Sequence, residues 1–175
     1  MSDIQTTANV AAPVDSSAPS RPVDYEDGWR LYRKMGSPKF VVAPMVDQSE
    51  LPFRMLCRKY KADLAYTPMF HAGLFSTGAT YREKHFTTCA EDRPLTVQFC
   101  ANNPDTLLAA AKHVEDQCDA VDINLGCPQG IAKRGHYGSF LLEDVPLIVR
   151  LGMRNAMKLC WRCHLVLITV LRPVW

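Results

Sequence analysis

The stretch from Asp122 to Phe140 reads DINLGCPQGIAKRGHYGSF and holds the residues of this sequence that are best suited to chemistry. An apolar strand pattern ends at Asn124, and Cys127 follows in a turn that contains Gly and Pro. A free cysteine is often only a small buried core residue, so packing is the alternative to chemistry. The position of Cys127 directly after a strand favours chemistry, because such loops carry functional groups without disturbing the sheet.

Basic side chains follow this cysteine within ten residues. Lys133, Arg134 and His136 could bind the phosphates of a nucleic acid. A solvated basic loop explains the same residues about equally well. The formal net charge of the chain is only +2, so electrostatics alone does not identify a nucleic-acid-binding protein.

Two further strand ends carry unusual residues. Ala43, Pro44 and Met45 follow the apolar run FVV, and the polar Gln98 lies inside the run LTVQFC. A polar residue near a strand end can simply be satisfied by backbone groups, which is the alternative for Gln98. If the strands are parallel, their carboxyl ends share one edge of the sheet, and these residues should lie on the same side as Cys127.

Alternating patterns along the chain predict the elements that position these residues. Strands are predicted near 40–46, 64–69, 95–100 and 121–124, each of them before a helical pattern, and a further strand over 165–171. Asp47 or Ser49 should cap the first of these helices, Asn103 should cap the helix that opens with Pro104, and the last helix should begin around Asp144. Residues 71–94 give no clear pattern. Four strand–helix units predict an α/β fold with a parallel sheet, either doubly wound or part of a (β/α)₈ barrel.

The composition suggests four segments. Residues 1–24 are rich in Ser, Thr, Ala and Pro and are expected to be a disordered tail, and 25–38 form a short N-terminal segment with a helix over 25–36. The folded part is predicted over 39–151, and 152–175 form a divergent tail. Seven cysteines without an apolar leader indicate a reducing compartment, cytoplasm or nucleus, and no apolar run is long enough to cross a membrane.

The motifs APMVDQSELPFRMLCRKY, YTPM, RPLTVQFCANNP and DINLGCPQGIAKRGHYGSFLLED together resemble the N-terminal half of the tRNA-dihydrouridine synthases. They are most similar to the eukaryotic type that acts at positions 16 and 17 of the tRNA D-loop, and the resemblance covers about 39–151. It implies a TIM-type (β/α)₈ barrel cut to about its first four βα units. It also implies FMN-dependent reduction of uridine in tRNA, with NADPH or NADH as the reductant.

The resemblance assigns a role to each candidate residue. Cys127 would protonate C5 of uracil after hydride reaches C6, a role that suits a thiol because its ordinary pKa of about 8.5 leaves it mostly protonated at neutral pH. Ala43, Pro44 and Met45 would lie along the flavin ring, and Gln98 would hydrogen-bond to it. Asn124 would face the substrate pocket, with Lys133, Arg134 and His136 near the tRNA phosphates. Gly130 stands where the family commonly has Lys, so one phosphate contact would be missing.

The resemblance ends near Leu151, before a Lys-bearing strand, the loops that hold the FMN phosphate and a helical tRNA-binding domain. We therefore expect an incomplete and inactive synthase, and the alternative is a non-catalytic fragment that binds RNA or the full-length enzyme. Exposed sheet edges would favour self-association. Another FMN barrel oxidoreductase, acting on a small molecule, is a further alternative. The GCP cysteine and the KRGHYG segment distinguish the tRNA enzymes from it. The segment CWRCH at 160–164 fits a haem-attachment pattern without its usual setting, so no metal or haem is predicted.

Overall fold

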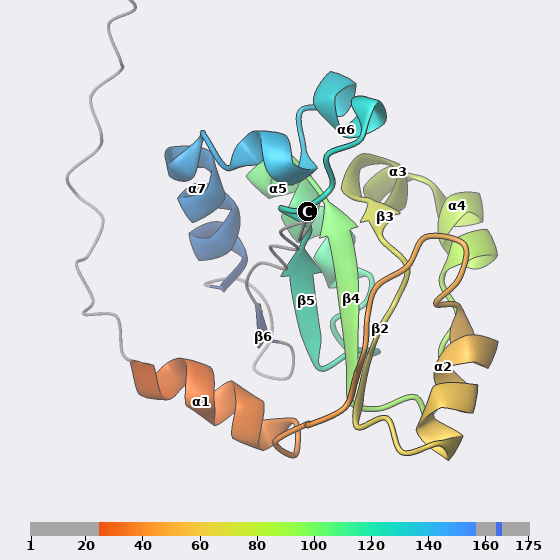
Figure 1. Cartoon of the computed structure of the whole chain (residues 1–175). Coiled ribbons are helices and arrows are strands. Elements are labelled where there is room, and N and C mark those ends of the chain that lie inside the picture. The colour runs from red at the N-terminus through yellow and green to blue at the C-terminus, as the bar shows by residue number, and fades with distance from the viewer. Residues whose placement is uncertain (1–24, 157–163, 166–175) are drawn as a thin grey trace, which may run out of the picture.

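A computed structural model describes residues 25–156 and 164–165 of the chain (Figure 1). The predicted disordered tail over 1–24 and most of the segment 152–175, including CWRC and the strand predicted beyond Leu165, lie outside the described residues. No helix among the described residues is long and apolar enough to cross a membrane.

A parallel sheet forms the centre of the molecule (Figure 1). Its strands are β1 (Val41–Val42), β2 (Leu64–Tyr66), β3 (Phe70–His71), β4 (Leu95–Cys100), β5 (Ala120–Ile123) and β6 (His164–Leu165). The order is β1-β2-β4-β5-β6, and β3 pairs with the end of β4. Every pairing is parallel, which confirms the predicted α/β fold with a parallel sheet.

Two of the predicted strands are shorter than expected. The strand predicted over 40–46 is only β1, whose outer edge has no strand beside it among the described residues. The strand predicted over 64–69 stops at Tyr66, and the chain pairs again only at Phe70, opposite Phe99. Pro68 lies in this interruption and has no N–H group to donate to a neighbouring strand.

Helices cover the sheet and its carboxyl end (Figure 1). They are α1 (Tyr25–Lys34), α2 (Leu51–Lys59), α3 (Ala72–Thr77), α4 (Ala79–His85), α5 (Pro104–Lys112), α6 (Gly130–Gly135), the 3₁₀ helix η1 (Gly138–Leu141) and α7 (Val145–Ala156). In Figure 1 α2, α3 and α4 lie to one side of β4, α7 lies to the other, and α6 lies beyond the tips of the strands. The region 71–94, for which no structure was predicted, thus contains the end of β3 and the helices α3 and α4.

The helix cap predicted at Asn103 is correct, the predicted start of the last helix around Asp144 is also correct, and the cap predicted for α2 is wrong. The Asn103 side chain accepts hydrogen bonds from the N–H groups of Asp105 and Thr106, and Asp144 accepts one from Leu147. The helix α2, however, begins after Glu50, and neither Asp47 nor Ser49 caps it. The Ser49 hydroxyl instead pairs with the backbone of Met45, so it stabilises the turn after β1.

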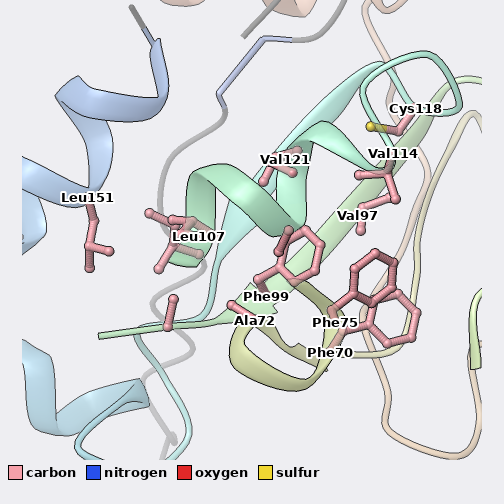
Figure 2. Close-up of a cluster of buried hydrophobic side chains, with 14 of the residues drawn as sticks. Phe70, Ala72, Phe75, Val97, Phe99, Leu107, Val114, Cys118, Val121 and Leu151 are labelled. Carbon is pink, nitrogen blue, oxygen red and sulfur yellow. The ribbon is translucent and has the colours of Figure 1, made fainter. Parts of the chain in front are cut away.

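The two faces of β4 have opposite character because side chains alternate along a strand. Leu95, Val97 and Phe99 belong to the main apolar cluster, which also contains residues of α5 such as Leu107 (Figure 2). Phe99 lies with Phe70 and Phe75 in this cluster, and the Phe75 and Phe99 ring centroids are 5.2 Å apart. The alternate residues of β4 are Thr96, Gln98 and Cys100, which are buried on the opposite face.

Candidate active site

The backbone of Cys127 is held from two directions. Its N–H donates to the Asn124 side-chain oxygen at 2.9 Å, and its carbonyl accepts hydrogen bonds of 3.1 Å from both the N–H and the hydroxyl of Ser139. The neighbouring Gly138 has a φ of 65°. Its backbone lies so close to Cys127 that a Cβ added to Gly138 would be 2.5 Å from the Cys127 carbonyl oxygen. The half-buried cysteine is thus in a tightly defined loop at the carboxyl end of β5.

A chain of buried amide and carboxylate groups connects this loop to β4. The Gln98 Nε2 donates to Asp122 Oδ2 at 2.7 Å, and Gln98 Oε1 accepts from Asn124 Nδ2 at 3.1 Å. Asn124 Oδ1 then accepts from the N–H groups of Gly126 and Cys127. Because Gln98 and Asp122 are 1% and 0% exposed, this network fixes which end of the Gln98 amide points toward Asn124.

Cys100 and Tyr137 were not among the predicted site residues, yet they form a small cluster with Ala132 against which Cys127 packs. Burial raises the pKa of Cys100 to about 12. Burial, and then the neighbouring Cys100 and Cys127, raise the pKa of Tyr137 as well. The alternation Thr-x-Gln-x-Cys along β4 could have identified Cys100, whereas Tyr137 depends on the fold of the 130–138 segment.

The predicted flavin-contacting residues Ala43, Pro44 and Met45 leave the carboxyl end of β1, two strands away from β4 in the sheet order. Ala43 is exposed, while Pro44 and Met45 are half-buried. They therefore lie at the same edge of the sheet as Gln98 and Cys127, as expected for parallel strands.

A buried arginine stabilises the turn that follows β1. Arg54 of α2 is 1% exposed, donates twice to Asp92 at 2.9 and 2.7 Å, and donates to the Ser49 carbonyl at 2.7 Å. Ser49 in turn bonds to Met45 through its hydroxyl. Sequence reasoning missed this arrangement, since an arginine on a helix is normally expected at the surface.

The predicted basic residues lie on α6 and just after it. Lys133 and Arg134 are exposed on the helix, and His136 is exposed at its end with a left-handed φ of 50°. Gly130, which departs from the Lys of the family pattern, begins the helix. The loop expected here is thus partly helical, and its basic side chains are exposed to solvent.

A parallel sheet with helices around it, and with a cysteine and buried amides gathered at the carboxyl ends of its strands, is the arrangement of a TIM-barrel-type α/β enzyme domain. The family model described as dihydrouridine synthase (Dus) matches residues 41–159, and the chain belongs to this family.

Curated relatives agree with this assignment. The chain is 60% identical over 139 residues to the tRNA-dihydrouridine(16/17) synthase [NAD(P)(+)] of Saccharomyces cerevisiae. It is 58% identical over 123 residues to the enzyme of the same name from Schizosaccharomyces pombe, and 55% identical over 121 residues to a similarly named protein of Mus musculus. These alignments cover 78%, 69% and 68% of this chain but only 33%, 31% and 26% of the relatives. The chain therefore spans about a third of the length of the relatives or less.

Proposed function

We propose that this chain carries the cysteine half of a tRNA-dihydrouridine synthase site, which reduces uridine 16 or 17 of the D-loop when the remainder of the barrel is present. The observation that carries this proposal is the hydrogen-bonded series Asp122–Gln98–Asn124–Cys127, which joins a buried amide to the cysteine loop. The names of the relatives at 55–60% identity supply the substrate and the NAD(P)H reductant.

FMN is the cofactor that we propose for this site, and the donor set of the described residues fits its ring. After bonding to Asp122, the Gln98 amide keeps a second N–H, and its oxygen keeps a second lone pair. The pyrimidine edge of a flavin ring offers acceptors and a donor of matching kind. The phosphate of such barrels binds at loops after the seventh and eighth strands, which the described residues do not contain.

Bound FMN would supply the hydride that adds to C6 of the uracil ring. The Cys127 thiol would donate its proton to C5 of the uracil ring. The resulting Cys127 thiolate would then take up a proton from water. Asn124 and Ser139 would keep the Cys127 backbone fixed while the proton moves. Because the target base must leave its stack, Lys133, Arg134 and His136 would bind the flanking phosphates.

A chimeric enzyme tests this function directly. Residues 41–159 of this chain would replace the matching segment of the Saccharomyces cerevisiae relative, which supplies the missing two thirds. We expect the purified chimera to bind FMN and to form dihydrouridine on unmodified tRNA, measured by nucleoside mass spectrometry. A chimera that folds and binds FMN but leaves the tRNA unmodified would refute the proposed function. The 175-residue chain alone is expected to show no turnover.

The exposed edge of the sheet favours a second, non-catalytic role for the short chain. Phe40 is 66% and Val41 is 51% exposed at the edge of β1 that pairs with no other strand within the described part of the chain, and Leu56 is exposed on α2. In a closed barrel this edge pairs with the last strand, so the edge can accept a strand from a second copy of the chain. Sedimentation velocity should show a dimer that Val41→Lys converts to monomer, and a wild-type monomer at all concentrations would exclude this role.

A further inference from the structure

A pocket of about 210 Å³ lies at the carboxyl end of β4, beside the Cys127 loop. Its walls come from 71–73, 100–103, Thr106, Gly135 and Tyr137. Cys127 does not line it, but Cys100 and Tyr137 do, and the same two residues belong to the cluster against which Cys127 packs. The pocket and the cysteine loop therefore share a wall.

The lining of this pocket combines polar and apolar groups. No Lys, Arg, Asp or Glu is among its residues. Asn102 Nδ2 donates to the Gly135 carbonyl, and Asn103 Oδ1 caps α5. These bonds leave Asn102 Oδ1 and Asn103 Nδ2 without a protein partner within the described part of the chain. Both side chains line the pocket, so each keeps one polar atom that a neutral ligand could bond.

Two aromatic rings stand at the same place. The His71 and Tyr137 rings meet edge to face with their centroids 6.0 Å apart, and both line the pocket. Proteins that read RNA commonly take single unstacked bases, which they stack on Tyr or His rings and bond through their polar edges. Drug-sized ligands occupy pockets of about 300–1,000 Å³. This pocket is smaller, so its volume suits a ligand of only one or two rings.

We propose that this pocket binds one unstacked nucleobase of the same RNA strand that places its target uridine at Cys127. This inference rests on the proposed function, which brings an RNA loop to this edge of the sheet. A phosphate is a poor fit because no Lys or Arg lines the pocket, and a metal ion is a poor fit because no carboxylate does. The basic side chains of Lys133 and Arg134 lie outside the lining, where they can hold the strand between the two bases.

Photo-crosslinking of the 175-residue chain locates the base. The probe is a short single-stranded oligouridine with one 4-thiouridine, and crosslinked residues are identified by mass spectrometry. We expect crosslinks at His71, Asn102 or Tyr137. This map needs no variant, so it decides the question whether or not a substituted chain folds.

Substitution of one pocket residue then measures the affinity of the pocket. Thr106 lines the pocket from the first turn of α5. The side chain that caps this helix is Asn103 and not Thr106. Thr106→Leu should fill the pocket and weaken oligouridine binding about tenfold, the lower range for one stacked base. Thr106→Val keeps the size of the side chain and should bind within twofold of wild type.

The outcomes separate this proposal from the proposed function. Crosslinks that fall only near Lys133 and Arg134, together with unchanged binding by Thr106→Leu, would overturn the pocket and leave the function standing. Folded chain that binds no oligouridine would also overturn the pocket. Crosslinks in the pocket combined with a chimera that binds FMN but forms no dihydrouridine would retain the base-binding pocket and refute only the reductase function.

Discussion

The Cys127 N–H donates to Asn124 Oδ1 at 2.9 Å, so the residue that follows β5 holds the backbone of the cysteine three positions later. The same oxygen accepts from Gly126, and the Asn124 amide donates to Gln98. In this structure these three bonds of the side chain are internal, so Asn124 positions the cysteine loop. Its contact with the substrate, which the family resemblance implies, stays a prediction.

Asn124→Ala should loosen the cysteine loop. Each lost hydrogen bond contributes about 1 kcal/mol, so the Gly126 and Cys127 amide protons should exchange at least about fivefold faster. Asn124→Asp is the comparison variant: it keeps the oxygen that accepts from Gly126 and Cys127, but replaces the donor to Gln98 with a charged carboxylate oxygen. Hydrogen exchange measured by NMR on the 175-residue chain distinguishes them, and equal protection in wild type and Asn124→Ala would show that the loop is held by other contacts.

Gly138→Ala should destabilise the fold by more than about 1–2 kcal/mol, the usual cost of a left-handed residue with a side chain. The added Cβ would also lie 2.5 Å from the Cys127 carbonyl oxygen and 3.0 Å from the Cys127 Cβ. Gly130→Ala is the control, since its Cβ would meet only the end of Arg134 at 3.8 Å. Urea denaturation gives both values, and equal midpoints for the two variants would contradict this account.

Arg54→Met should cost about 3–5 kcal/mol, because it leaves the carboxylate of Asp92 buried without its main partner. Arg93→Met breaks a second ion pair, between Arg93 and Asp119, whose side chains are 38% and 27% exposed. This pair should contribute no more than about 1 kcal/mol. If the two variants unfold at the same urea concentration, the buried network does not stabilise the chain as proposed.

Stability should fall at high pH through Cys100. Burial raises its pKa to about 12, so at high pH the folded chain keeps a proton that the unfolded chain has lost. The contribution is complete below pH 9 and is lost as the pH rises toward 12. The urea midpoint of wild type should therefore drop more steeply between pH 8 and pH 10.5 than that of Cys100→Ala. Parallel curves for the two proteins would contradict the assignment.

Cys127→Ala in the chimera should leave FMN binding and flavin reduction by NAD(P)H nearly unchanged. Dihydrouridine formation should fall by about two to four orders of magnitude, the usual contribution of a positioned general acid. Nucleoside mass spectrometry measures the product, and flavin absorbance follows the reductive half-reaction as the control. Turnover within a factor of ten of the parent chimera would mean that another group protonates C5.

Much of the fold follows from local patterns. The four predicted strands all exist and are parallel, and Asn103 and Asp144 cap their helices, because apolar periodicity and capping depend on neighbours close in the sequence. The cap expected at Ser49 was wrong because a contact outside the helix decides where this side chain bonds. Its hydroxyl bonds to Met45, and the helix begins two residues later.

The sequence by itself determined the position of Cys127 after a strand, the parallel α/β class and the family. Only the tertiary structure decided which groups meet at that position. Gln98 and Asn124 are 26 residues apart in the chain, and Arg54 and Asp92 are 38 apart, yet each pair is in direct contact. Such contacts arise from strand register and helix packing, which bring distant segments together at distances that no local pattern encodes. The pocket lined by 71–73, 100–103, Thr106, Gly135 and Tyr137 exists for the same reason, since three separate segments of the chain meet there only after the sheet has formed.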